Sequence, residues 1–322
     1  MSGPILPPGS EGRERFDSLF VSPHGHDAVL ACPGRIVGES ERGRRVLVLA
    51  LFDVVGREPS AAGILRALGA GYVTAGLPAP PAPGAGDPRL ALRATSDDAE
   101  EVLFAAAQLL AELGPRSGAT QLYAPLGLAG SAAHRLTHAA ALRAFASETG
   151  RNLYLYEERP EAFAPGVVRT RLALLGARLP PAAAPGLERA GLARRLWRLN
   201  EPTRLRGEGR RLGERLRAFG PAVGEWRRAR AWNPLRALGP RLQPIVHSAD
   251  EETRDRARAA AEAVLPRDRK GRPRAARRFN ALADAAAKRF GAAYHAERLW
   301  LLLPSSEGLP ELRHPLESVP GI

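Results

Sequence analysis

The sequence predicts an α/β protein with a Rossmann-like, mostly parallel sheet that carries helices on both faces. Short apolar runs typical of buried strands alternate with segments of helical periodicity over the first half of the chain. Such alternation indicates parallel strands joined by helical crossovers. The 322 residues, 44% of them hydrophobic and 25% charged, are enough to bury a core of this kind.

Local signals delimit these elements. Ser22-Pro23 ends the first apolar run, Pro33-Gly34 starts or interrupts the first helix, and Gly114-Pro115 is expected to end the long helix that follows residue 97. In chain order we expect strands or helices at 19–21 (strand), 30–37 (helix), 46–52 (strand), 60–68 (helix), 97–113 (helix), 122–124 (strand), 132–149 (helix) and 152–156 (strand).

The composition changes after about residue 165. Residues 1–15 are predicted to be a flexible leader, 16–165 an α/β domain, and 166–322 a mainly helical, Arg-rich part that packs on that domain. Clear helical patterns in this last part cover 250–264 and 274–290.

The formal net charge of +13 comes almost entirely from arginine, since only Lys270 and Lys288 are lysines. Residues 186–240 hold 14 arginines against five glutamates, which predicts a solvated helical face. A binder of anionic surfaces or nucleic acid, recognised by salt-dependent binding, is an alternative. Because no nucleic-acid motif accompanies the charge, nucleic acid is not the expected partner.

The same sequence limits the compartment. No apolar run approaches the length of a membrane span, and the N-terminus lacks the pattern of a secretory signal, so the expected location is the cytoplasm. A single cysteine, Cys32, excludes an intrachain disulfide and is expected to be a small core residue.

Four of the seven histidines fall in two tight clusters, at 23–27 and 134–138, each after a predicted strand. Loops after parallel strands meet at one sheet edge, and imidazole with carboxylate suits zinc. A histidine pair on a helix is more often solvated or satisfied in the core, so spacing alone leaves both interpretations open. The pair His134 and His138 has the spacing of a zincin helix, but Arg135 occupies the place of its glutamate base, which excludes that motif.

Four stretches in order resemble the PIG-L/LmbE-like family of zinc-dependent N-deacetylases. They are Pro23-His24-Gly25-His26-Asp27-Ala28, similar to P-H-P-D-D-E; 125–135 (PLGLAGSAAHR), similar to P-L-G-L-G-x-H-x-D-H-R; 155–160 (LYEERP), similar to F-Y-E-D-x-P; and 293–300 (AYHAERLW), similar to A-E-R-x-W. The resemblance spans most of the chain and implies the Rossmann-like fold expected above.

Carried over by this resemblance, the zinc ligands are His24, Asp27 and His134. The family's general base, an aspartate, is replaced by His26, which we expect to act as the provisional acid/base. Three further motif positions differ from the family: its final Glu is Ala28, its outer His is Ser131 and its Asp is Ala133. Whether His138 is a fourth ligand stays open.

The resemblance thus implies a zinc-dependent hydrolase that removes an acetyl or similar acyl group from an N-acetylglucosamine-type or related amide. The partner would be a small N-acyl amino-sugar-like molecule. The four departures from the motif support a competing hypothesis, a non-catalytic homologue that acts as a binding or scaffold protein. The sequence does not identify the substrate or the oligomeric state.

Overall fold

The computed structural model describes residues 15–53, 59–78, 97–128, 132–146, 150–163, 166–180, 239–268 and 271–303, with Asn233, Leu235 and Ala237. Residues 1–14 of the predicted leader 1–15, most of the Arg-rich segment 186–240, Ser131 and His314 therefore lie outside the described residues. Within the described ranges, no helix is long and apolar enough to cross a bilayer.

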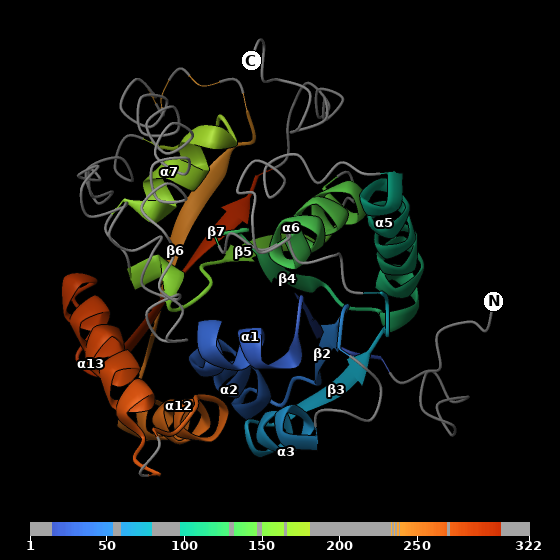
Figure 1. Cartoon of the computed structure of the whole chain (residues 1–322). Helices are drawn as coiled ribbons and strands as arrows, with labels where there is room; N and C mark the ends of the chain where they lie inside the picture. The colour runs from blue at the N-terminus through green and yellow to red at the C-terminus, as the bar shows by residue number, and fades with distance from the viewer. Residues whose placement is uncertain are drawn as a thin grey trace, which may run out of the picture.

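One seven-stranded sheet organises the molecule (Figure 1), with the order β3-β2-β1-β4-β5-β7-β6. The five strands β1 to β5 run parallel, β7 is antiparallel to β5, and β6 is antiparallel to β7. The predicted class, a mostly parallel sheet with helices on both faces, is confirmed. The strands are β1 (Ser18–Ser22), β2 (Val46–Ala50), β3 (Ala70–Thr74), β4 (Gln121–Pro125), β5 (Asn152–Tyr156), β6 (Leu242–Ala249) and β7 (His295–Leu302).

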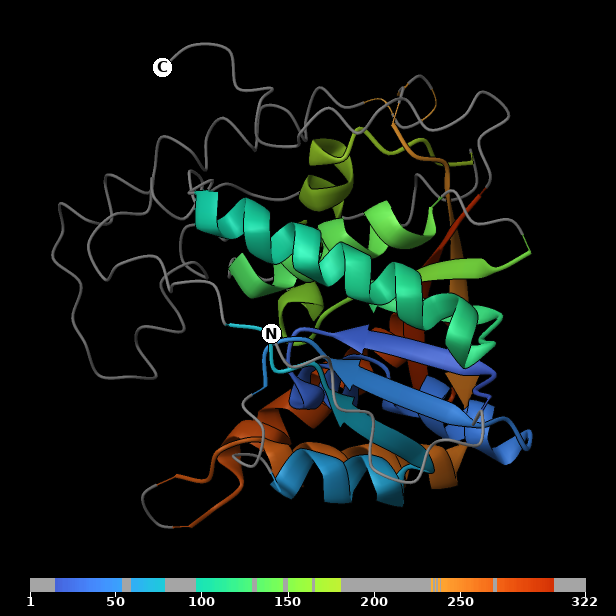
Figure 2. The same cartoon turned by 90° about the vertical axis from the view of Figure 1, so that its right-hand side faces the viewer.

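Helices form a layer on each side of the sheet (Figure 2). Along β1, Leu19 and Val21 join one apolar core and Phe20 joins the other, because successive side chains of a strand point to opposite faces. The first core is covered by α5 (Asp97–Ser117), α6 (Ala132–Phe145) and α7 (Val167–Leu174). The second is covered by α1 (Gly25–Ala31), α2 (Pro33–Glu41), α3 (Pro59–Ala67) and α12 (Glu251–Val264), and α13 (Arg274–Arg289) packs against α12 and β7.

Pro33 begins α2 at its first turn, where its missing N–H costs nothing, as one of the two sequence alternatives predicts. Cys32 lies between α1 and α2, fully buried as expected. The helix expected at 30–37 is two helices, since α1 ends at Ala31 and α2 runs from Pro33 to Glu41. Two further helix ends were predicted wrongly. Helix α5 runs through Pro115 to Ser117, since a proline near the last turn forfeits one hydrogen bond while keeping helical φ. Helix α6 ends at Phe145 rather than at 149.

Three strands were not predicted. Edge strand β3 follows Gly69 directly and contains Gly71, which weakens its apolar signal. Edge strand β6 contains Pro244, and β7 buries charged residues, so neither shows the usual alternation. Strands from both sides of residue 165 therefore belong to one sheet; the division into parts at that residue stays a prediction.

Candidate active site

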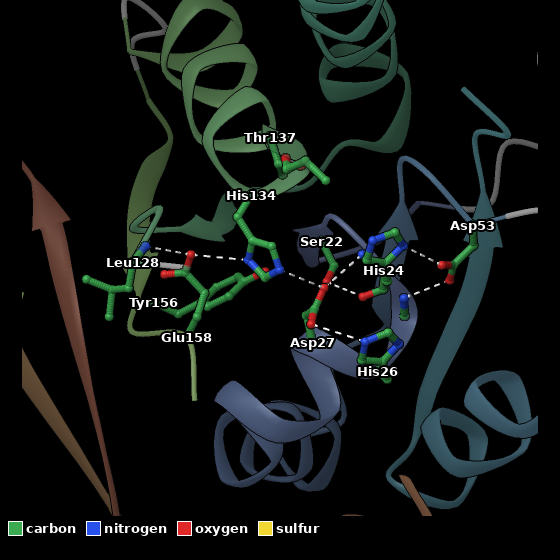
Figure 3. Close-up of polar contacts among 12 residues, drawn as sticks. Ser22, His24, His26, Asp27, Asp53, Leu128, His134, Thr137, Tyr156 and Glu158 are labelled. Carbon is green, nitrogen blue, oxygen red and sulfur yellow. Dashed lines mark hydrogen bonds and ion pairs between the residues drawn. The ribbon is translucent and has the colours of Figure 1, made fainter. Parts of the chain in front are cut away.

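The candidate site lies at the carboxyl edge of four neighbouring parallel strands (Figure 3). His24 follows β1, Asp53 follows β2, His134 is carried by α6 after β4, and Glu158 follows β5. The chain leaves β1 toward β2 on one side and later adds β4 on the other, so β1 and β4 border the point where strand order reverses. Such a point is where open α/β sheets bind their ligands.

The loop after β1 is fixed by its own hydrogen bonds. His24 is the N-cap of α1, and its backbone N–H donates to the carboxylate of Asp27, in the first helical turn, at 3.1 Å. The hydroxyl of Ser22 donates to the carbonyl oxygen of His24 at 2.6 Å. The hydrogen bond from His24 holds the side chain of Asp27 in the first turn of α1, at the sheet edge.

Asp27 meets histidines from both clusters. Its Oδ2 lies 3.4 Å from Nε2 of His134, and its Oδ1 lies 3.4 Å from Nε2 of His26. The imidazole rings of His24 and His26 stack with their centroids 5.5 Å apart. The structure therefore brings together all four residues that the sequence proposes for the site.

Two further carboxylates, those of Asp53 and Glu158, lie beside the Nδ1 atoms of His24 and His134. Oδ1 of Asp53 lies 3.0 Å from Nδ1 of His24. Oε1 of Glu158 lies 3.4 Å from Nδ1 of His134 and also accepts the backbone N–H of Leu128 at 2.8 Å. Both carboxylates are buried.

The surroundings of the two imidazoles favour positive charge. The hydrogen bond with Asp53 raises the pKa of His24 against the opposing effect of burial. Burial lowers the pKa of His134, but its contact with Glu158 and the charge of Asp27 outweigh this and raise it. Burial opposes ionisation of Asp53, yet the bonds from His24 and Tyr72 lower its pKa. The same negative field would stabilise a bound cation.

The donor types match zinc, which accepts imidazole nitrogen and carboxylate oxygen. A carboxylate on the outer nitrogen of each histidine is also the usual support of zinc-binding imidazoles. Over the described ranges, however, no three His, Cys, Asp or Glu side chains are arranged as a group that could hold a metal ion. The fit is therefore one of donor type and charge rather than of a closed coordination shell.

His138 lies apart from this group. It is buried, its Nδ1 lies 2.8 Å from the carbonyl oxygen of Pro125, and its Nε2 has no hydrogen-bond partner in the described structure. Burial, together with the charge of Arg171, lowers its pKa to about 3. His138 is thus a neutral core residue. At the altered motif positions, Ala28 and Ala133 are buried apolar residues.

Asp53 and Glu158 were not proposed as site residues from the sequence. Asp53 directly follows the apolar run 46–52, and an acidic residue at a strand end was the available signal. Glu158 lies in the stretch 155–160 that carries the family resemblance, but nothing in its spacing indicates a contact with His134.

The chain resembles solved structures of known proteins. No family model matches the chain, and no curated protein matches it. Among solved structures, the zinc-inhibited form of teicoplanin deacetylase Orf2 superposes with a TM-score of 0.56 at 14% identity, covering 90% of this chain and 99% of that one. The deacetylase–teicoplanin complex gives 0.53 at 14% identity with the same coverage. At this identity the likeness concerns the fold, and this chain has the fold of the PIG-L/LmbE-type deacetylases that its motifs resemble.

Proposed function

We propose that this protein is a zinc-dependent hydrolase that removes an acetyl or related acyl group from an N-acetylglucosamine-type or similar amide. The observation that carries the proposal is the approach of Asp27 and His134, 107 positions apart in sequence, to 3.4 Å beside His24 at the edge of a deacetylase-type sheet. A teicoplanin deacetylase of this fold was solved in a zinc-inhibited form, which supports binding of zinc by a protein of this fold.

In this proposal His24, Asp27 and His134 are the zinc ligands. A bound zinc ion supplies Lewis acidity, which polarises an amide carbonyl and lowers the pKa of water. Asp27 contributes a negative oxygen held in place by the N–H of His24, and His134 approaches from α6 with its Nε2 toward Asp27. The first turns of α1 and α6 therefore bring a carboxylate oxygen and an imidazole nitrogen toward each other.

His26 is assigned the proton transfer that an aspartate performs in the family. Its side chain is 38% exposed, so a substrate can reach it, and its Nε2 lies beside the proposed ligand Asp27. An imidazole accepts and releases protons near neutral pH, which suits a residue that first takes a proton from water and then gives one to a leaving amine.

A non-catalytic binding protein is the second candidate. Ala28 and Ala133 place buried methyl groups where the family has polar side chains, and these positions take no part in proton transfer. Such a protein would keep the fold and bind an acylated sugar-like ligand without hydrolysing it.

Metal analysis tests the proposal directly. We expect purified protein, after zinc addition and gel filtration, to retain about one zinc per chain by elemental mass spectrometry. The double variant His24→Ala/His134→Ala should lose it. His247→Ala is the matched control, because that imidazole, on β6, contacts the carbonyl oxygen of Gly34 in α2 and is not among the site residues.

Acetate release, measured together with zinc content, distinguishes the hydrolase from the binding protein. Zinc retention with acetate release from N-acetylglucosamine-type amides supports the hydrolase. Wild-type protein that is folded, takes up no zinc and releases no acetate contradicts it and favours the binding protein.

A further inference from the structure

Asp53 occupies a position that no motif assigns. Its Oδ2 accepts two hydrogen bonds, from the N–H of Gly25 at 2.7 Å and from the hydroxyl of Tyr72 at 2.5 Å. These bonds tie the end of β2 to the first turn of α1 and to β3. They leave the other oxygen, Oδ1, at 3.0 Å from Nδ1 of His24.

The two oxygens of Asp53 have different hydrogen-bond partners, and this difference bears on the position of the His24 proton. A carboxylate accepts hydrogen bonds and donates none. Nδ1 of His24 must therefore carry a proton to bond Oδ1, and in the neutral imidazole the lone pair is then on Nε2. Burial strengthens this preference, because Asp53 is almost fully enclosed and an unpaired charged oxygen would be costly there.

We infer that Asp53 is a positioning residue that keeps the proton of His24 on Nδ1 and so makes Nε2 the nitrogen available to a metal ion. Tyr72 and Gly25 fix the carboxylate that does this. The part that concerns zinc rests on the proposed function, whereas the placement of the proton does not.

The substitution Asp53→Asn gives a sharp test. Gly25 and Tyr72 both donate to the same oxygen, so the amide oxygen of the new side chain must take that place. Its NH₂ group then faces Nδ1 of His24 as a donor. Nδ1 must become an acceptor, and the proton moves to Nε2, where it competes with a metal.

Two measurements follow on wild type and variant. In the metal-free protein, ¹⁵N NMR of the imidazoles at a pH where they are neutral should show the proton of His24 on Nδ1 in wild type and on Nε2 in Asp53→Asn. Zinc affinity, measured by competition with a chelator, should fall about 10–100-fold in the variant.

Asp17→Asn is the matched control. Asp17 is an exposed carboxylate before β1, at the opposite edge of the sheet, where it accepts the N–H of Arg45. It should leave both the position of the proton and the zinc affinity unchanged. An Asp53→Asn protein that is folded, keeps the proton on Nδ1 and binds zinc like wild type would overturn the inference.

Failure of the proposed function gives a different result. If wild-type protein binds no zinc, the hydrolase proposal falls, while the NMR comparison still decides whether Asp53 sets the tautomer of His24.

Discussion

Two histidines one helical turn apart on α6 lie in opposite environments. His134 lies between the carboxylates of Asp27 and Glu158, which raise its pKa. His138 is enclosed in the core, bonded to the carbonyl of Pro125, with a pKa of about 3. The residue type and the spacing are those of a metal-binding pair, but only His134 faces the sheet edge. Which of these two histidines lies in the candidate site depends on which face of α6 is turned toward the carboxyl ends of the strands.

The low pKa of His138 makes the protein sensitive to acid. Above pH 6.5 the residue is neutral in both states and contributes no pH dependence. Below it the unfolded chain takes up a proton that the folded chain refuses, so the free energy of unfolding should fall by up to about 1.4 kcal/mol per pH unit toward pH 3. Urea unfolding between pH 7 and pH 4 measures this slope.

In His138→Asn, which keeps an N–H donor for Pro125, that part of the slope should disappear. The contributions of all other groups cancel in the comparison of slopes. Equal slopes in wild type and His138→Asn would contradict the burial of a neutral imidazole.

Substitution of His26 should change the rate of the proposed reaction. If it transfers the proton, His26→Ala should lower kcat by about 10²–10⁴-fold while zinc content stays near one per chain. His26→Asp, which restores the acid of the family motif, should recover part of the rate. Acetate release and elemental analysis on the same preparations measure both. A folded His26→Ala protein with wild-type kcat would remove His26 from the mechanism.

At the scale of elements, a strand from the far end of the chain caps the N-terminus of α2. The carboxylate of Glu297, on β7, accepts the N–H groups of Gly34 at 2.6 Å and Arg35 at 2.8 Å and bonds His295 at 2.8 Å. Gly34 permits this approach, because a Cβ there would lie 2.9 Å from the His295 ring. Burial raises the pKa of Glu297, but His295 and neighbouring positive charge lower it to about 2.

Glu297→Gln should therefore destabilise the protein by about 2–4 kcal/mol at pH 7, since it removes a buried charge that binds a helix N-terminus. The folded pKa lies below the unfolded value of 4.5, so this stability is present above pH 4.5 and is lost as pH falls toward 2. The difference from wild type should shrink over that interval in urea titrations.

The control for this prediction is Glu41→Gln. Glu41 pairs with Arg256 at 2.9 Å on the surface, where both side chains are in contact with solvent. Its loss should change the free energy of unfolding by less than about 1 kcal/mol. Equal effects of Glu41→Gln and Glu297→Gln would refute the cap.

On the scale of the whole molecule, the C-terminal strands are tied to the parallel part of the sheet by a buried ion pair. Glu157, directly after β5, accepts hydrogen bonds from Arg298 at 2.5 Å and from the indole of Trp300 at 2.9 Å. Arg159 reaches the carbonyl of Ala296 on β7 at 2.6 Å. Because Glu158 lies between these two anchors, the antiparallel pair β6–β7 supports the backbone that carries Glu158 to His134.

Arg298→Met should cost about 3–5 kcal/mol of unfolding free energy, because it leaves the carboxylate of Glu157 buried without its cation. The double variant Glu157→Gln/Arg298→Met should be more stable than Arg298→Met alone, since it removes the unpaired charge as well. Urea unfolding of the two single variants and the double variant gives the coupling. A double variant no more stable than Arg298→Met would show that the pair is not coupled.

Local signals in the sequence determined the α/β class and strand β5 to the residue, and they gave a helix start at Pro33 as one of two alternatives. These signals succeeded because an apolar run and a proline at a first helical turn each act over a few neighbouring residues. The four histidine and aspartate candidates of the site came from the family resemblance, and their roles stay a prediction. The same signals missed β6, which contains Pro244, and β7, whose buried Glu297 and Arg298 bond partners more than a hundred residues away.

Only the tertiary structure decided that His134 faces Asp27 while His138 turns into the core, that Asp53 and Glu158 hold the outer nitrogens of the two site histidines, and that the sheet continues to Leu302. Each of these facts is a pairing between segments distant in sequence. The spacing of residues in the sequence is the same whichever way a side chain points. Its orientation depends on the contact partner that folding brings to it from another segment.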